Sequence, residues 1–375
     1  MKFRNITLNK WRLCLILFIP LQVIIFNLAV RNHQGIENVY SRHIYKGIVF
    51  LLRNLFGWIP LPIAQILLFA LIVIPIVWIG RQVIKIKQKR QRFGVFLWNA
   101  ITLGLAFFSV FYFLFMTLWG FNYHRQSVSE IVQINPSNIS AKELEDVCEK
   151  LIQLTNESRS RFTSDEQQAA VVPMSHRQMI EKAVMGYEEI TRTYQFLAYK
   201  NRSVKPVFFP QLMSMFGIGG IYIPYTGEAI VNMDPPSYLL PATICHEMAH
   251  QLGFSPEDEA NYISFLVCRA SPDPYFQYSG YFMAMRYAMN AIGGANKEAF
   301  LRLRNQISKG VMVDIEANKA YWNKFYNPLS TFSSFFYDYF LKANGQVEGI
   351  RSYSLMVKLI VGDYRKSLNA KPPRR

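Results

Sequence analysis

The stretch "ICHEMAHQLGFSPEDEANYISFL", residues 244–266, holds two histidines followed by three consecutive acids. His246 and His250 are four residues apart, so on a helix they lie one turn apart on the same face. Two imidazoles held in this way can bind one zinc ion, and Glu247 is placed as a base toward water at that ion. The apolar residues around the motif indicate a buried helix, in which two histidines and a carboxylate need something to compensate them. We therefore predict a Zn2+ site rather than a purely structural helix.

The third zinc ligand is expected among the three acids. Gly253 is predicted to end the first helix in the left-handed conformation, and Ser255–Pro256 to begin the next as N-cap and first residue. Asp258 would then reach back to the N-cap amide as a capping residue. Glu257 and Glu259 are about 200° apart around a helix, so they cannot both face the metal. We predict Glu257 as the ligand because its helix face carries small residues, with Glu259 as the alternative.

Three long apolar segments precede the motif, and each is long enough to cross a bilayer core of about 30 Å. The first is longer than a typical signal-peptide core and lacks an A-x-A-like cleavage site, which favours a retained helix. The predicted spans are 13–30, 59–79 and 93–120. The predicted organisation is a membrane region over 1–123, a globular domain over 124–368 and a disordered tail over 369–375.

Basic residues predict the orientation of these spans. Segment 81–92 carries six Lys or Arg and no acid, and the first twelve residues carry four. By the positive-inside rule both lie in the cytoplasm, so three crossings place everything after residue 123 outside it. The expected location is the cytoplasmic membrane, crossed three times with the N-terminus in the cytoplasm, and residues 45–58 are expected to lie along its outer interface.

The net charge of +16 does not predict nucleic-acid binding, because much of it flanks the apolar segments and no nucleic-acid-binding motif accompanies it. A lipid bilayer is therefore an expected partner and a nucleic acid is not. The four cysteines include one in an apolar span and no CxxC pair, which excludes a disulfide framework and a cysteine zinc site. No pattern indicates an oligomeric state.

The sequence of the globular part predicts an α+β fold that is mostly helical. Residues 137–159 open with Ser140 and Glu143 in capping-box spacing, and 175–198 predict a second helix. Residues 204–210 and 217–233 are β-branched, aromatic and punctuated by Gly and Pro, which is typical of short strands and turns. After residue 244 helical patterns return, at 280–294, 297–308 and 352–368.

Two further features bear on a substrate. A strand through 221–223 can hold a peptide as an added strand on a sheet edge, although a Gly-rich hairpin without a ligand is equally compatible with the pattern. A donor for a developing oxyanion is also expected. The candidates downstream of the motif are Tyr278, Tyr281, Arg286, Tyr337 and Tyr339.

"HEMAH" followed by "EDEAN" resembles the gluzincin group, in which a glutamate on a following helix completes the H-E-x-x-H site. Together with "GIGGIYIPYTGEAIVN" and "YFLKANGQVEGIRSY", the motif is similar to a domain of unknown function in bacterial membrane proteins with three N-terminal helices. This resemblance covers nearly the whole chain and implies a gluzincin-like domain with ligands His246, His250 and Glu257. Only six residues separate His250 from Glu257, fewer than is usual in gluzincins, so the second helix must turn back at once.

These patterns together predict a membrane-anchored zinc metallopeptidase that cuts a peptide or protein substrate outside the cytoplasm. The alternative is an inactive zinc-binding domain that binds peptides or cell-envelope components. Glu247 favours the enzyme, because a structural zinc site needs no base. A transporter is disfavoured because the apolar spans contain almost no ionisable residue.

Overall fold

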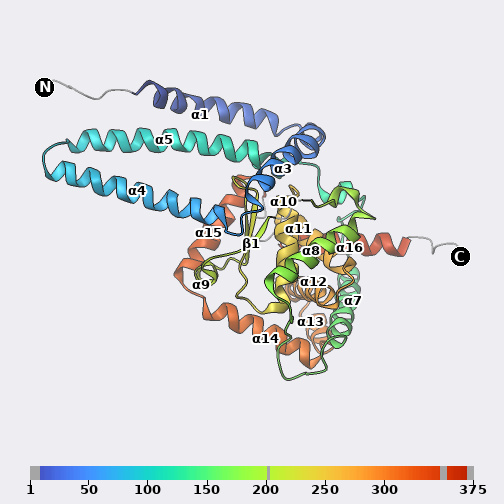
Figure 1. Cartoon of the computed structure of the whole chain (residues 1–375). Helices are drawn as coiled ribbons and strands as arrows, with labels where there is room; N and C mark the ends of the chain where they lie inside the picture. Colours follow the sequence, from blue (N-terminus) through green and yellow to red (C-terminus); the bar gives the residue numbers. More distant parts are fainter. Residues whose placement is uncertain (1–8, 201–202, 347–352, 370–375) are drawn as a thin grey trace.

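The computed structural model describes residues 9–200, 203–346 and 353–369. Long helices dominate it, and a three-stranded sheet lies where the helices of the N-terminal third meet the remainder of the chain (Figure 1). The predicted class, α+β and mostly helical with three apolar N-terminal helices, is confirmed.

Three helices are long and apolar enough to cross a membrane: α1 (Lys10–Ala29), α4 (Ile63–Lys87) and α5 (Phe93–Leu118). The start of α1 and the α4–α5 turn lie at one end of this group, and the rest of the chain lies at the other (Figure 1). A buried hydrogen bond of 2.9 Å from Gln22 to Ser109 joins α1 to α5. Helix α4 continues beyond the predicted end at residue 79, because the basic residues that follow it are good helix formers. Most of the basic segment is therefore helical rather than a loop.

Between the first two long helices, the chain folds back toward the sheet. It forms a short helix α2 (His33–Gly35), a π-helical segment η1 (Ile36–Ile44) and α3 (Tyr45–Phe56). Buried side chains of η1 and α3 form a small core with Trp119 at the end of α5 and Tyr222 of the sheet. The opposite face of α3 exposes large apolar side chains. This segment thus links the long helices to the remainder of the chain.

The remaining helices enclose one large hydrophobic core. A capping box at Ser140 starts α7, as the residue spacing predicts, and a second capping box, at Ser175, starts α8. Helix α8 ends at Thr191, seven residues before the predicted end, and a short 3-10 turn η3 (Gln195–Leu197) follows. The helices are α6 (Val128–Ile131), α7 (Ala141–Ser160), α8 (His176–Thr191), α9 (Pro210–Met215), α10 (Leu240–Gln251), α11 (Glu257–Ala270), α12 (Pro274–Ala295), α13 (Lys297–Arg304), α14 (Lys309–Lys324), α15 (Pro328–Ala343) and α16 (Tyr353–Asn369), with 3-10 turns η2 (Gly120–His124) and η4 (Ser237–Leu239).

The sheet has the order β1-β3-β2, with β1 (Val204–Pro206), β2 (Gly220–Ile223) and β3 (Glu228–Val231). Strand β1 runs parallel to β3, and β2 is antiparallel to it, with Ile221 opposite Ile230. No other described strand pairs with β2, so its outer backbone edge is open. The predicted strands are confirmed, and 221–223 lie on an edge.

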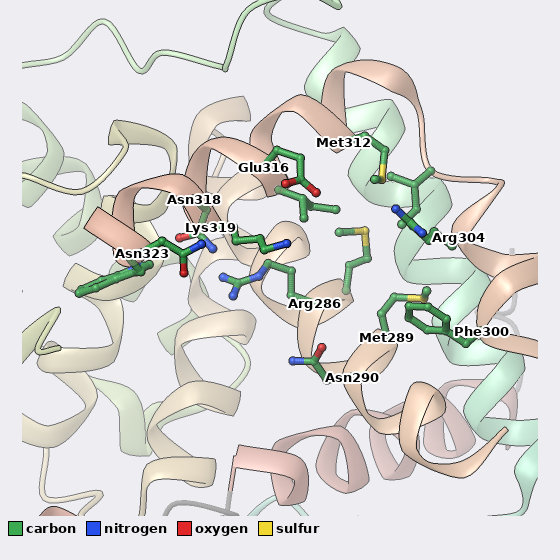
Figure 2. A pocket seen from close by; sticks show the side chains of 14 residues that line it. Arg286, Met289, Asn290, Phe300, Arg304, Met312, Glu316, Asn318, Lys319 and Asn323 are labelled. Atoms are coloured by element: carbon green, nitrogen blue, oxygen red, sulfur yellow. The ribbon is translucent and has the colours of Figure 1, made fainter. Parts of the chain in front are cut away.

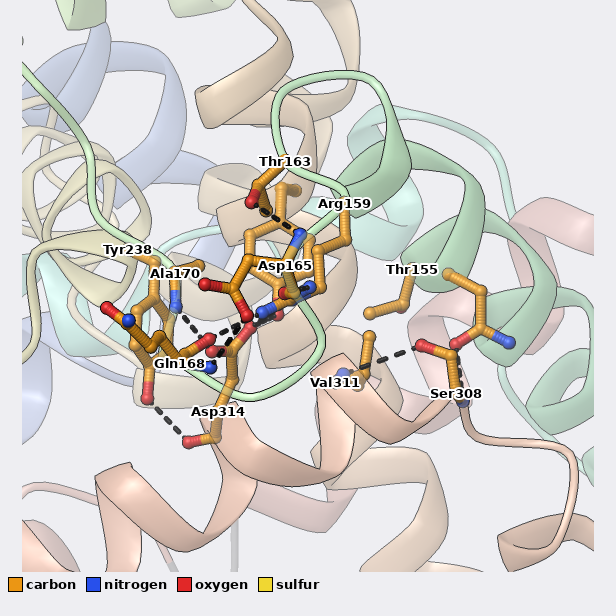
Figure 3. A network of polar contacts seen from close by, with 12 residues as sticks. Thr155, Arg159, Thr163, Asp165, Gln168, Ala170, Tyr238, Ser308, Val311 and Asp314 are labelled. Carbon is orange, nitrogen blue, oxygen red and sulfur yellow. Dashed lines mark hydrogen bonds and ion pairs between the residues drawn. The ribbon is translucent and has the colours of Figure 1, made fainter.

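A buried ion pair between Arg159 and Asp314 connects α7 to α14 (Figure 3). Arg159 Nε donates to Asp314 Oδ2 over 2.8 Å, and Asp314 Oδ1 accepts the Ala170 amide over 2.6 Å. The Tyr278 hydroxyl also donates to this carboxylate. Arg159 additionally donates to the carbonyls of Asp165 and Gln168. The network therefore holds the loop after α7 against the helical core.

Of the predicted disordered tail, 369–375, Asn369 ends α16 and residues 370–375 lie outside the described residues.

Candidate metal centre

Helix α10 carries His246, Glu247 and His250 and ends at a glycine-dependent turn. Gly253 has φ +87°, its amide donates to the His250 carbonyl, and the Phe254 amide donates to the Ala249 carbonyl. This is the Schellman pattern, which favours glycine. A Cβ on Gly253 would also lie 2.8 Å from Cε1 of Tyr45. The predicted left-handed glycine is confirmed, and it turns the chain back toward the two histidines.

The start of α11 differs from the prediction. The N-cap is Pro256, whose backbone is extended (ψ 134°), and the helix begins at Glu257. The Ser255 hydroxyl has no hydrogen-bond partner among the described residues, and no side chain caps this helix. The predicted capping box of Ser255 and Asp258 is therefore wrong. Contacts of the buried turn, rather than local capping, determine where the helix starts.

The structure brings His246, His250 and Glu257 together. Their potential ligand atoms all lie within 4.8 Å of one another. The Nε2 atoms of His246 and His250 are 3.3 and 3.4 Å from the two Glu257 oxygens. Two ligands of one tetrahedral zinc ion, each bound at roughly 2.0 Å, lie roughly 3.3 Å apart. The spacing and the His2Glu donor set thus fit a zinc ion with one open position.

Glu259, the alternative third ligand, is not part of this cluster. Its Oε1 accepts the Val128 amide over 2.9 Å, at the start of the short helix α6. Burial, together with the neighbouring Asp258, raises the pKa of Glu259 to about 8. Its carboxyl group therefore serves the packing of α6 against α11, on a different side of the helix from Glu257.

Glu247 lies under the edge strand. The residue is 3% exposed, and its Oε2 has no hydrogen-bond partner within the described part of the chain. A Cβ on Gly220 of β2 would lie 2.6 Å from Cδ of Glu247. Burial raises the pKa of Glu247, despite the attraction of the two histidines. A buried acceptor without a partner is costly in a fold and indicates a position reserved for a ligand or water.

His250 and Glu257 are held by polar contacts at the cluster. His250 Nδ1 is 2.7 Å from the Phe254 carbonyl, which can only accept, so Nδ1 carries a proton and Nε2 is the nitrogen that faces Glu257. Burial would lower the pKa of His250, but Glu257 outweighs it and raises the pKa to about 9. Burial would likewise raise the pKa of Glu257, but the two imidazoles hold it well below its usual range. Glu257 is therefore an anion facing both rings.

Arg125 braces the turn between the two helices. Its guanidinium donates two hydrogen bonds, of 2.8 and 3.0 Å, to the Glu37 carboxylate, and a third, of 3.1 Å, to the Gly253 carbonyl. It also lies 4.1 Å from the centre of the Phe254 ring. These contacts fix the turn that determines where Glu257 lies relative to the histidines.

The small core beside the long helices reaches the motif directly. The Tyr45 hydroxyl donates to Tyr222 over 3.1 Å and lies 3.2 Å from the Gln251 carbonyl. The Trp119 ring packs edge-on to the His250 ring, with centroids 6.0 Å apart. The site is thus built partly from residues that belong to the N-terminal third.

Of the five predicted oxyanion donors, Tyr337 lies at the cluster, where its hydroxyl donates to Glu257 Oε1. The others lie elsewhere: Tyr278 donates to Asp314, Tyr281 packs on Phe265 and Tyr339 is exposed. Arg286 lines a separate cavity of about 360 Å³ between α12, α13 and α14 (Figure 2). Sequence spacing offered no signal for Tyr337, since 80 residues separate it from Glu257.

The comparisons assign the chain to a family. A model described as "Protein of unknown function (DUF3810)" matches residues 40–361. This chain is a DUF3810 protein. The match spans most of the small core, the sheet and all three clustered residues, so the site lies within the part shared with the DUF3810 family. No curated protein and no solved structure matches the chain.

Proposed function

We propose that this chain is a membrane-anchored, gluzincin-like zinc metallopeptidase. The observation that carries the proposal is the convergence of His246, His250 and Glu257 beside the buried carboxylate of Glu247, whose Oε2 has no partner among the described residues. In the proposal, the three clustered residues would hold a zinc ion. As a Lewis acid, that ion would polarise a carbonyl group and lower the pKa of a water molecule. A structural zinc site would use the same three ligands but has no use for Glu247.

The substrate is proposed to bind as a fourth strand on the open edge of β2. Gly220 lets β2 itself lie directly against Glu247, since a side chain at this position would displace the carboxylate, and so the edge strand and the base lie side by side. Main-chain hydrogen bonds along an edge strand bind an extended peptide without demanding a particular sequence. The scissile carbonyl then lies between Glu247 and the clustered residues.

Glu247 is proposed to move the proton. Its carboxylate accepts a proton from the attacking water as the water oxygen bonds to the carbonyl carbon. It then donates that proton to the departing nitrogen as the C–N bond breaks. The raised pKa of Glu247 suits both transfers, because a catalytic pKa nearer to neutrality serves acid and base roles alike.

The proposed location places the site outside the cytoplasm of a bacterial cell. The support is the basic segment 81–92 at the far end of α4 and α5, opposite the sheet and the site (Figure 1). If the basic ends of α4 and α5 lie in the cytoplasm, the opposite ends of these helices, and the site beside them, lie on the outer face of the membrane.

The test compares the full-length wild type with Glu247→Gln on a peptide library in detergent, with zinc content measured in parallel. Glu247→Gln is expected to keep its zinc and to lose peptide hydrolysis by about 10²- to 10⁴-fold. Glu259→Gln, a matched change outside the cluster, should keep both. Equal turnover in wild type and Glu247→Gln, or none in either, would reject a peptidase and favour a zinc domain that binds peptides without cutting them.

A further inference from the structure

Helix α15 exposes an entire face of large apolar side chains. Phe332, Phe335, Phe336 and Tyr339 follow the spacing of one helix face, and each is 62 to 72% exposed. A helix in water turns such a face toward the core. Here the inward face carries Leu341, which is buried, and Tyr337, which meets Glu257.

Helix α9 continues this surface. Phe209 and Leu212 are 54 and 46% exposed. The Asn327 amide donates to the Met215 carbonyl over 2.9 Å, which ties the end of α9 to the start of α15. We call these six side chains the apolar surface: Phe209, Leu212, Phe332, Phe335, Phe336 and Tyr339.

The apolar surface adjoins two of the long apolar helices. Phe209 packs on Phe69 of α4 with centroids 5.9 Å apart, and the Phe208 amide donates to Gln65 of α4 over 2.7 Å. On the other helix, Phe340 packs on Phe115 of α5 with centroids 5.9 Å apart. Both contacts lie at the ends of α4 and α5 nearest the sheet, where α9 and α15 lie in Figure 1.

The charge pattern indicates what covers this surface. Residues 206–227 and 325–337 contain no Asp, Glu, Lys or Arg, in a chain whose residues are 18% charged. A protein surface in water is rarely so apolar over such an area. The charges of α15, Asp338 and Lys342, pair with each other in its last turns. An aromatic face that continues the apolar flank of membrane helices and ends in such a pair matches the boundary between lipid headgroups and acyl chains.

We propose that the apolar surface is a second membrane-contact site, embedded in the outer boundary of the bilayer that α1, α4 and α5 cross. Helix α15 then lies along the lipid surface with its outer face in the acyl region. Because Tyr337 projects from the other side of α15 onto Glu257, the metal cluster lies about one helix diameter, roughly 10 Å, above the lipid. This proposal concerns lipid contact and holds whether or not the site cuts peptides.

The test uses the full chain in vesicles of phosphatidylethanolamine and phosphatidylglycerol, with nitroxide labels on Phe335→Cys and Leu212→Cys. Cys14→Ser removes the one exposed native cysteine. Ile74→Cys on α4 serves as the lipid reference and Leu301→Cys on α13 as the water reference, since both side chains are exposed. All four replace exposed side chains, so the packed core is left intact.

Labels at 335 and 212 are expected to collide more with oxygen than with a water-soluble nickel chelate, as the label at 74 does. The label at 301 should show the reverse. Collision with the chelate at 335 and 212 would place this surface in water and overturn the proposal. Protection from both reagents would also overturn it, because protein, such as a second copy of the chain, would then cover the surface.

Discussion

Gly220 on the edge strand lies directly against Glu247 on the motif helix, so close that a Cβ on Gly220 would lie 2.6 Å from Cγ and Cδ of Glu247. A side chain at position 220 must therefore displace the carboxylate. This contact joins the proposed substrate strand to the proposed base, and neither can shift without the other.

Gly220→Ala is expected to lower kcat/KM for peptide hydrolysis by about 100-fold, because a displacement near 1 Å of a catalytic group has that effect. Zinc content should be unchanged, since the clustered residues are not touched. Gly219→Ala is the matched control: among the described residues, a Cβ there comes within 4 Å of Thr243 Cγ2 alone, at an ordinary contact distance of 3.9 Å. Equal activity in the two variants would contradict the placement of Glu247 under the strand.

Tyr337→Phe should weaken zinc binding by about 10- to 100-fold, the usual effect of losing a partner that orients a metal ligand. The hydroxyl of Tyr337 donates to Glu257 Oε1 and so fixes how that carboxylate faces the histidines. A titration against a competing chelator measures the change. Tyr339→Phe, on the exposed face of the same helix, should bind zinc as the wild type does; identical affinity in both variants would show that Tyr337 does not support the ligand.

The stability of the turn should depend on pH through Glu37. Burial would raise the pKa of Glu37, but Arg125 and Arg42 outweigh it and hold the pKa below the ordinary 4.5. A lowered folded-state pKa adds stability that is complete above about 4.5 and is lost as the pH falls through the folded-state value. Glu37→Gln should therefore melt at a lower temperature than the wild type near neutral pH.

The difference in melting temperature between wild type and Glu37→Gln should shrink toward zero as the pH falls below 4.5, the ordinary pKa of Glu37. Glu166→Gln, at an exposed position, should have the same melting temperature as the wild type at every pH. If Glu37→Gln still melts below the wild type by the same amount in acid, the ion pair with Arg125 contributes nothing to the stability of the folded state.

Asp314→Asn should destabilise the helical core by about 3 to 5 kcal/mol, because it leaves the Arg159 guanidinium buried without its anion. Thermal unfolding in the presence of a zinc chelator measures this apart from any metal effect. Asp146→Asn, in an exposed pair with Lys142, should leave the melting temperature unchanged. A similar melting temperature for all three proteins would show that the Asp314 network is dispensable.

Local patterns predicted much of this architecture. The long apolar helices, the capping box at Ser140, the strands and the left-handed Gly253 all follow from residues near one another in the chain. Helical spacing also separated Glu257 from Glu259, because two residues along a helix reverse its face.

Contacts between distant segments could not be predicted in this way. Tyr337 reaches Glu257 across 80 residues, and Arg125 reaches Glu37 across 88. No sequence spacing encodes such a meeting, since it depends on how whole helices pack. The same reason explains why α11 starts one residue later than its Ser-Pro pattern predicts: the buried turn that Arg125 braces fixes the backbone there.

The central claim is that His246, His250 and Glu257 form one zinc site, and the most direct test is the metal content of the purified full-length protein at neutral pH. Wild type, Glu247→Gln and Glu259→Gln are expected to retain stoichiometric zinc through dialysis, because none of these changes removes a clustered residue. His246→Ala, His250→Ala and Glu257→Ala should each lose it. A wild type without zinc, or zinc that survives the loss of either histidine, would contradict the account.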